Sequence, residues 1–302
     1  MAQKTNRLKA RRKMLFYVCM MALPCLQFFI FWICVNANSL LLAFRRYDYD
    51  EGFLWAGLDN FIQVIKDFGE VEFFGKSVRN SLIVYAFSLF LSTPLSVLFA
   101  FYLSKKLRGS GLFKTVLFLP HILSSLIMVI LFKYFVDRAI PEVYEQLTGN
   151  TMQGLLANMD TTFSMIVFYN IWTGFGTSTM MYLGAMSGIS DSVVEAAELD
   201  GVTPLKELWY ITVPMIWPTF MTFVVVGFTG LFTNQINLYN FYGDQAEYRY
   251  YTFGYYLYIS IRNASIGEYP YLAALGLLLT AVAAPLTLLL RKAMNKFGPK
   301  TI

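Results

Sequence analysis

The stretch EAAELDG, residues 195–201, lies between two long apolar segments and is followed by Ile211 and Pro214. Five acidic residues occur in or near it, and they are Asp191, Glu195, Glu198, Asp200 and Glu207. Charged side chains oppose insertion into a bilayer, so membrane insertion does not account for these acids. The segment 188–213 therefore predicts two short, water-facing helices, here called the polar hairpin, placed where a soluble partner can bind them.

The composition of the whole chain is that of a membrane protein. Of its 302 residues, 57% are hydrophobic and only 14% are charged, whereas soluble domains carry about a quarter charged residues. Apolar runs of about 20 residues are long enough to cross a bilayer as helices. Six such runs occur, near residues 14–40, 81–103, 112–135, 162–186, 214–235 and 271–290.

These runs predict an all-α polytopic membrane protein with six transmembrane helices and the polar hairpin between the fourth and the fifth. The predicted organisation is a basic N-terminal segment over 1–13, one transmembrane domain over 14–290 and a tail over 291–302. The first span lacks a small-residue cleavage site at the right distance, so we expect an uncleaved anchor. Its three cysteines, Cys19, Cys25 and Cys34, are expected to be small buried apolar residues without disulfide or metal-binding spacing.

The distribution of basic residues predicts the orientation. They cluster at the N-terminus, after the second span and after the sixth, as Lys4, Arg7, Lys9, Arg11, Arg12, Lys13, Lys105, Lys106, Arg108, Lys114, Arg291, Lys292, Lys296 and Lys300. With six crossings all three clusters lie on one side, which the positive-inside rule makes the cytoplasm. The polar hairpin falls on the same side although it is acidic. The net charge of +5 borders the membrane and needs no nucleic acid to explain it.

The polar hairpin has helix start and stop signals. Ser192 and Glu195 fit a capping box, and Gly201 suits the left-handed residue that ends a helix. Thr203 and Pro204 suit the cap and the first turn of a second helix. A close-docking face is expected from Ala196 and Ala197, an amphipathic stripe from Leu205, Leu208, Trp209 and Thr212, and the start of the fifth span at Pro214. An ordinary helical loop, with Glu195 serving only as a cap, explains these local features equally well.

Two further segments outside the spans have recognisable patterns. The apolar spacing after Asp59 and Asn60 predicts a short amphipathic helix along the outer membrane surface. The segment 236–270 is rich in tyrosine, which favours anchoring at the membrane interface over ligand stacking.

The polar hairpin resembles the EAA loop of ATP-binding-cassette importer permeases. The matching residues are Glu195, Ala196, Ala197, Asp200, Gly201, Ile211 and Pro214. Matches to the sugar-permease branch continue along nearly the whole chain, at Ala43-Phe44, Tyr47-Asp48, Gly57-Leu58-Asp59-Asn60-Phe61, Arg79-Asn80-Ser81, Leu119-Pro120, Trp172, Gly174 and Phe175. The chain departs from the pattern at Ser190, where the family usually has proline. It departs again at 240–244, where the family has a Gly-Gly-Pro turn facing the binding protein.

The resemblance implies a function and a set of partners. In the family this loop is the coupling helix, which docks into a cleft of the ATPase subunit. The implied complex contains a second homologous permease, two ATP-binding subunits that hold ATP and Mg, and a lipid-anchored or periplasmic solute-binding protein. The chain itself is then expected to bind no cofactor, to catalyse no reaction and to lie in the bacterial plasma membrane with both termini in the cytoplasm. Its implied task is the uptake of a carbohydrate, expected to be an oligosaccharide.

Neutral polar residues in the fourth and fifth spans are the candidates for a substrate pathway. They are Asn170, Trp172, Thr173, Thr177, Ser178, Thr229, Thr233, Asn234, Gln235 and Asn237. Hydroxyl and amide groups beside aromatic rings suit a neutral sugar, which needs directional hydrogen bonds and no counter-charge. Hydrogen bonding between helices is the alternative for each of them, and Trp172 suits sugar stacking and packing equally.

Other residues argue against different functions. His121 is the only histidine, and a lone histidine offers no proton relay, so we expect it to satisfy the backbone near Pro120. Lys133 and Asp137 are expected to pair or to extend toward the interface. The run 109–115 ends in Lys-Thr but has Phe113 where a phosphate loop needs glycine. An ion-coupled or channel-like transporter without ATPase subunits is the remaining alternative.

Overall fold

The computed structural model describes residues 2–70 and 72–299, with side chains from residue 13 onward. Almost every element is helical, and the chain divides into two compact units. The first unit comprises Met1–Asp67 and Asn263–Thr280, and the second comprises Phe68–Arg262 and Ala281–Ile302. The basic side chains before Lys13, and Lys300, lie outside the described part of the chain.

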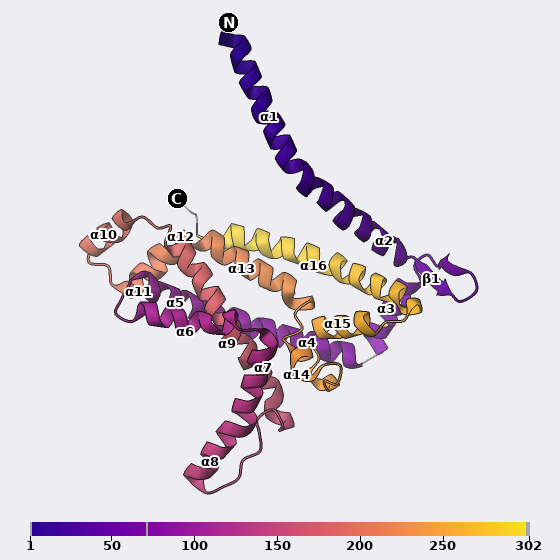
Figure 1. The fold of residues 1–302 in the computed structure, drawn as a ribbon. Helices are drawn as coiled ribbons and strands as arrows, with labels where there is room; N and C mark the ends of the chain where they lie inside the picture. The colour runs from indigo at the N-terminus through magenta and orange to yellow at the C-terminus, as the bar shows by residue number, and fades with distance from the viewer. Residues whose placement is uncertain (1, 71, 300–302) are drawn as a thin grey trace. The chain divides into compact units, whose positions relative to one another are not determined.

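The first unit begins with a long helix and continues into a small sheet (Figure 1). The helix consists of α1 (Ala2–Gln27), a π-helical stretch (Phe28–Cys34) and α2 (Val35–Leu42). Strands β1 (Arg45–Asp48) and β2 (Gly52–Trp55) pair antiparallel, with Arg45 opposite Trp55. The Asp48 carboxylate accepts hydrogen bonds from the amides of Asp50 and Glu51, which hold the pKa of Asp48 below its usual value. The sheet could not be predicted from the sequence, because two four-residue strands carry too little periodicity.

The amphipathic helix expected after the first span is present as α3 (Asp59–Glu70). Asn60 does not cap it through its side chain. Instead, Asn60 Nδ2 donates to the carbonyl oxygens of Ala43 (2.9 Å) and Arg45 (2.7 Å). This residue therefore fixes the turn between α2 and β1, which gives a structural reason for the Asn in the Gly-Leu-Asp-Asn-Phe run.

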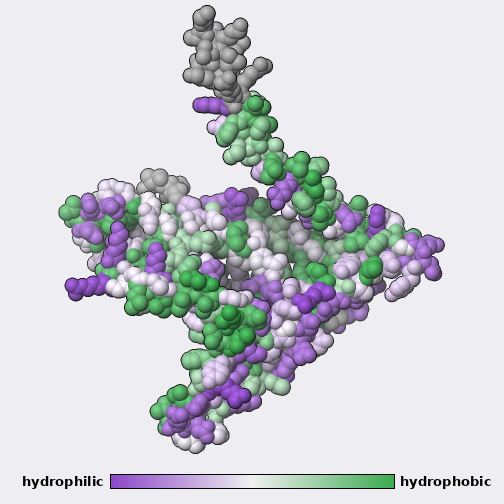
Figure 2. Space-filling view, in the orientation of Figure 1, coloured by the Kyte–Doolittle hydropathy of each residue, from purple (hydrophilic) through white to green (hydrophobic). Residues whose placement is uncertain are grey.

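Hydrophobic side chains cover the described part of the first helix (Figure 2). The cysteines Cys19, Cys25 and Cys34 are free thiols and are exposed. The expectation that they are buried was wrong, because a membrane-spanning helix presents apolar residues to lipid as well as to protein.

The second unit contains the remaining helices. They are α4 (Glu72–Phe87), α5 (Thr93–Ser104), α6 (Ser110–Ile122), α7 (Ser125–Tyr134), α8 (Ile140–Thr148), α9 (Met159–Met186), α10 (Asp191–Leu199), α11 (Pro204–Glu207), α12 (Val213–Met215), α13 (Trp217–Thr229), α14 (Leu238–Tyr242), α15 (Phe253–Asn263) and the second part of α16 (Tyr269–Phe297). A π-helical stretch (Ser88–Ser92) joins α4 and α5 into one helix. One core cluster surrounds Ile166 and Tyr169 of α9, and another contains Val97, Tyr182 and Leu208.

Within the described residues, three helices are long and apolar enough to cross a membrane: Lys13–Leu42, Glu72–Ser104 and Ile266–Phe297. Two bent helix pairs raise the number to five if each pair is one span. The predicted third span, 112–135, is not one straight helix, since α6 and the helix that starts at Ser125 meet at 104°. Leu123 and Ser124 are extended there, and Pro120 weakens the helix before them by removing a backbone donor.

The predicted fourth and fifth spans also take more specific forms. Helix α9 has 28 residues, about 42 Å at 1.5 Å per residue, which is enough to cross a bilayer. Threonine, asparagine and glycine lower its hydropathy, and α9 is not among the described helices that are apolar enough to cross a membrane, so its crossing stays a prediction. The fifth span does not begin at Pro214, because the helix runs from Pro204 to Met215 and then bends by 71° before Trp217.

Candidate functional site

The polar hairpin forms two short helices, as the sequence predicts. Helix α10 ends at Leu199, and Gly201 follows in the left-handed conformation with φ of 71°. Thr203 is the N-cap residue of α11, and Pro204 occupies its first turn. The prediction of a capping box formed by Ser192 and Glu195 was wrong, because α10 begins earlier, with Ser190 as its N-cap residue.

The faces of the polar hairpin differ from the prediction in a consistent way. Ala197 is buried and Ala196 is exposed, as expected for adjacent residues that point about 100° apart on a helix. In the second helix, Leu208 and Thr212 are buried whereas Leu205 and Trp209 are exposed. The expected docking pair and amphipathic stripe are therefore each split between an inner and an outer face.

The exposed face of the polar hairpin combines apolar and acidic side chains. Leu199 is 89% exposed and Tyr210 is 78% exposed. Asp191, Glu195, Asp200 and Gly201 are also exposed, while Ile211 and Pro214 are partly buried. Such a mixed surface between membrane helices resembles a protein-binding surface more than a lipid-facing one.

A second candidate site is a cavity of about 390 Å³, here called the polar cavity. It lies where α6 breaks from α7 and where the chain leaves α13, with α9 on one side. Its lining residues are Pro120, His121, Leu123, Ser125, Met128, Tyr169, Asn170, Thr173, Gly174 and Asn237. Three of the predicted pathway residues, Asn170, Thr173 and Asn237, therefore meet here.

Amide side chains join the walls of the polar cavity. Asn170 Nδ2 donates to the Ile236 carbonyl at 2.7 Å, and Asn237 Nδ2 donates to Asn170 Oδ1 at 2.9 Å. Asn240 Nδ2 extends the network to Asn237 Oδ1 (3.1 Å) and to Ser125 Oγ (3.3 Å). The network thus connects α9, the start of α7 and α14.

The backbone after α13 is irregular. Ile236 and Asn237 both have positive φ, at 45° and 56°, a conformation that costs free energy for residues other than glycine. Asn234 Oδ1 accepts from the Ile236 amide at 2.9 Å, and Asn170 holds the Ile236 carbonyl. These side-chain bonds satisfy backbone groups of Ile236 that the interrupted helix leaves without helical partners.

The other predicted pathway residues lie apart from the polar cavity. Asn234 lines a smaller cavity with Ser81 and Thr252. Trp172 is exposed and has Phe132 and Tyr169 as ring neighbours, and Gln235 is partly buried. The Thr177 hydroxyl is buried and lacks a hydrogen-bond partner among the described residues.

Among the described residues, the expected backbone bond of His121 and the pairing of Lys133 with Asp137 are not found, while extension of these two side chains toward the interface stays a prediction. His121 lines the polar cavity, and its ring centroid lies 5.4 Å from that of Phe118. Within the described residues it makes no hydrogen bond to the backbone near Pro120. Lys133 Nζ donates to the Phe241 carbonyl, and Asp137 Oδ1 accepts from the Leu156 amide. Lys133 and Asp137 are therefore not paired with each other.

The tyrosine-rich segment is a core element more than an interfacial belt. Tyr250, Tyr251 and Tyr255 are buried in the cluster around Ile166, and burial raises the pKa of Tyr255 to about 12. Asn80 Nδ2 donates to the carbonyls of Arg249 (2.8 Å) and Tyr251 (2.9 Å). The Arg-Asn-Ser run before the second span therefore anchors this segment to α4, a role that sequence reasoning did not assign.

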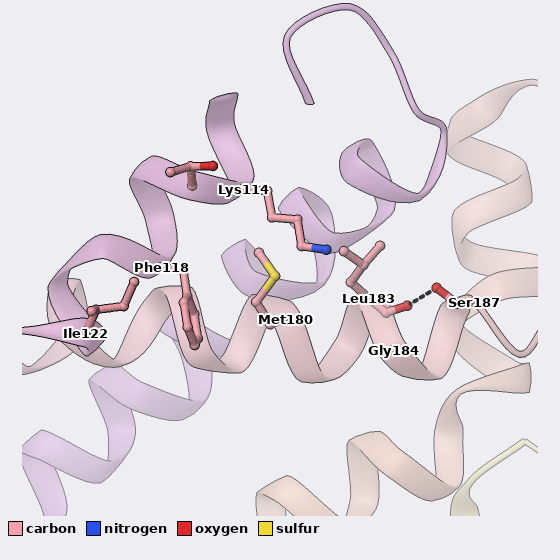
Figure 3. Close-up of a pocket in the computed structure, with 8 residues that line it drawn as sticks. Lys114, Phe118, Ile122, Met180, Leu183, Gly184 and Ser187 are labelled. Atoms are coloured by element: carbon pink, nitrogen blue, oxygen red, sulfur yellow. Dashed lines mark hydrogen bonds between the residues drawn. The ribbon is translucent and has the colours of Figure 1, made fainter. Parts of the chain in front are cut away.

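A cavity of about 580 Å³, larger than the polar cavity, lies between α6 and α9. Lys114, Phe118 and Ile122 reach it from α6, and Met180, Leu183, Gly184 and Ser187 line it from α9 (Figure 3). The two helices pack closely because Gly176 has no side chain, and a Cβ there would overlap the Leu117 carbonyl. The cavity is mostly apolar, so its chemistry suits packing more than sugar binding.

Comparison with known proteins identifies the chain. Residues 92–301 match the model of the family described as binding-protein-dependent transport system inner membrane component. The chain belongs to this family. It is 27% identical to YteP, the polygalacturonan/rhamnogalacturonan transport system permease protein of Bacillus subtilis strain 168, across 95% of this chain and 90% of that protein.

Solved structures show the same fold. One is a bacterial ABC transporter involved in the import of the acidic polysaccharide alginate, with a TM-score of 0.79 at 20% identity over 96% of this chain and 99% of that chain. A second is the bacterial alginate ABC transporter in complex with an alginate pentasaccharide-bound periplasmic protein. It has a TM-score of 0.78 at 20% identity, over 97% of this chain and 98% of that chain. The resemblance found from the EAA loop is thereby confirmed: the chain is a multi-pass permease subunit of an ABC importer.

Proposed function

We propose that this permease carries an oligosaccharide across the bacterial plasma membrane as one of two related permeases in an ATP-driven importer. The observation that supports this most is the polar cavity, where two interrupted helices and α9 place amide and hydroxyl groups together. Transporters commonly bind substrates at discontinuous helices near the middle of the bilayer. The cavity volume of about 390 Å³ is within the usual range for small-molecule sites.

The chemistry of the polar cavity favours a carbohydrate. Asn170, Thr173, Ser125 and Asn237 offer neutral donors and acceptors, which suit the hydroxyl groups of a sugar. The Bacillus relative is named for polygalacturonan and rhamnogalacturonan, and the structural neighbours import alginate. These names support a sugar chain as the substrate class. No lysine, arginine or carboxylate among the described residues lines the polar cavity, so the proposal assigns the selection of acidic sugar chains to other subunits.

The proposed topology has six crossings with both termini in the cytoplasm. The bent pairs serve as the third and fifth spans, and α9 serves as the fourth. This arrangement places the polar hairpin in the cytoplasm, and the tyrosine-rich segment faces the solute-binding protein on the outside.

The polar hairpin is proposed to dock into a cleft of an ATPase subunit. Its exposed Leu199, Leu205 and Tyr210 supply apolar contacts, and Glu195 supplies charge. ATP and Mg bind to the ATPase subunits, and this chain contributes no phosphate site. The Gly-Ser-Gly run near Lys114 instead starts α6, with Gly109 in the left-handed conformation. Closure of the two ATPases draws the polar hairpins together and opens the cavity outward.

Coexpression with candidate ATPase subunits, followed by affinity capture, tests this function. The wild-type chain is expected to capture an ATPase, and Gly201→Pro is expected not to. ATP hydrolysis by the reconstituted complex is then measured with binding protein and a panel that includes maltotriose and trigalacturonate. Stimulation by one of these oligosaccharides supports the proposal. ATPase-independent transport, driven instead by an ion gradient, would replace it with the ion-coupled alternative.

A further inference from the structure

One lysine contacts both helices of the polar hairpin. Lys105 Nζ lies 2.7 Å from Glu207 Oε2 of α11 and 3.7 Å from Glu198 Oε1 of α10. Lys105 is the C-cap residue of α5, and its amide bonds back to the Phe101 carbonyl. The ion pair therefore joins the end of the second membrane helix to the polar hairpin, two segments about a hundred residues apart in sequence.

The two contacts of Lys105 differ in strength. The side chain of Glu207 is 5% exposed and that of Lys105 is 24% exposed, whereas that of Glu198 is 64% exposed. Solvent screens the exposed contact with Glu198. A buried carboxylate that lost its partner would remain uncompensated in a low-dielectric environment, which is strongly unfavourable. Lys105 and Glu207 are therefore expected to move together when the hairpin moves.

Packed helices connect the ion pair to the polar cavity. Helix α5 packs along α9, and α9 carries Asn170 and Thr173 in the cavity wall. Apolar contacts of Leu208 and Ile216 with Val97 and Tyr182 surround the same junction. These apolar contacts have no preferred direction, whereas the ion pair fixes one point of the hairpin to one point of α5.

From this geometry we infer that Lys105 and Glu207 are positioning residues that transmit movement of the polar hairpin to α5 and, through α9, to the polar cavity. The inference rests on the proposed function, because it needs an ATPase that moves the hairpin. It adds a specific link that neither the EAA loop nor the family match assigns. It also accounts for one of the five acids whose presence membrane insertion does not explain.

The test measures how fast a thiol reagent reaches the polar cavity, so the identity of the sugar need not be known. Leu123, an exposed residue that lines the cavity, is replaced by cysteine in a chain whose three native cysteines are serine. The assembled complex is reacted with the small thiol reagent MTSET, with and without MgATP. In the otherwise wild-type complex, nucleotide is expected to change the labelling rate about tenfold, a typical size for coupling between two sites.

The deciding variant is the double substitution Lys105→Met with Glu207→Leu, which removes both charges and so leaves no buried charge unpaired. It is expected to assemble and to hydrolyse ATP, but to show less than about a twofold nucleotide-dependent change in labelling. Lys106→Met is the matched control, since Lys106 is exposed and has no ion pair among the described residues. It should respond like wild type, as should Lys105→Arg, which keeps the charge.

Each other outcome has a definite meaning. A double variant with the full nucleotide response would show that the ion pair is only structural and would overturn the inference. If the double variant fails to assemble, Glu207→Gln decides: a reduced response supports the link and an unchanged response overturns it. A wild-type complex that binds no ATPase, or whose labelling ignores MgATP, overturns the proposed function and this inference with it.

Discussion

Asn170 joins α9 to the irregular chain that follows α13. Its side chain donates to the Ile236 carbonyl and accepts from Asn237, and it also donates to the Ile166 carbonyl of its own helix. The sequence placed Asn170 correctly among the polar residues of the fourth span. It left binding and interhelical hydrogen bonding as alternatives, and the geometry allows both, because one amide supports the backbone and lines the cavity.

Asn170→Ala is expected to weaken both stability and uptake. The loss of two contacts between segments, each worth about 0.6 kcal/mol in membrane proteins, lowers the free energy of unfolding by roughly 1 kcal/mol or more. Thermal unfolding in detergent and oligosaccharide uptake measure the two effects. Ser164→Ala, at an exposed position of the same helix, is the control and should change neither. Unchanged stability in Asn170→Ala would contradict the assigned network.

Glu195 tests the outer face of the polar hairpin. It is exposed and makes no ion pair within the described residues, so its charge is available to a partner. Glu195→Lys is expected to reduce ATP-dependent uptake by tenfold or more, as reversal of a charge at an interface costs several kcal/mol. Membrane insertion should remain normal, which fractionation checks. Normal uptake by this variant would count against docking through this face.

At the scale of elements, local signals were predictive where one residue imposes a conformation. Gly201 ends α10, Thr203 and Pro204 start α11, and the apolar spacing after Asp59 gives α3. Prediction was less reliable where two nearby residues suit the same position. Ser190 and Ser192 are both suitable N-cap residues, and the helix uses the first. Hydropathy alone could not reveal the break at Leu123 and Ser124, because long apolar runs continue on both sides of the two serines, Ser124 and Ser125.

Gly201 provides a test of the hairpin's geometry. Its φ is 71°, and a Cβ there would meet no atom within 4 Å, so the cost of a side chain is conformational only. Gly201→Ala is expected to destabilise the turn by about 1 kcal/mol and to reduce capture of the ATPase. Gly201→Asn should retain most capture, because asparagine tolerates this conformation. Equal loss in both variants would point to a steric role of the glycine.

Gly176 tests the packing of α6 on α9. Gly176→Ala places a Cβ against the Leu117 carbonyl, and overpacking of this kind costs about 1–3 kcal/mol. A lower thermal midpoint in detergent is the expected result. The control is Gly184→Ala, since a Cβ at Gly184 of the same helix has open space. Equal stability of the two variants would show that α6 and α9 do not pack this closely.

At the scale of the whole molecule, the class of protein followed from composition, and the family followed from a set of motifs in the right order. The side-chain contacts between segments far apart in the sequence were not predictable. Asn80 contacts carbonyls about 170 positions later, and Lys105 meets Glu207. Such pairs depend on tertiary packing, which leaves no periodic signal in one sequence. The polar cavity was only partly predictable for the same reason, since Ser125 and His121 lie on a helix break that the sequence analysis treated as a continuous span.

The proposed function requires the polar hairpin to lie in the cytoplasm, where a soluble ATPase can move it. The most direct test labels Thr203→Cys, in a chain without native cysteines, with a membrane-impermeant maleimide. We expect labelling only after the cells are permeabilised, while a cysteine at Tyr49, an exposed residue between β1 and β2, is labelled in intact cells. Labelling of the Thr203 position in intact cells would place the hairpin outside, where no cytoplasmic ATPase could bind it.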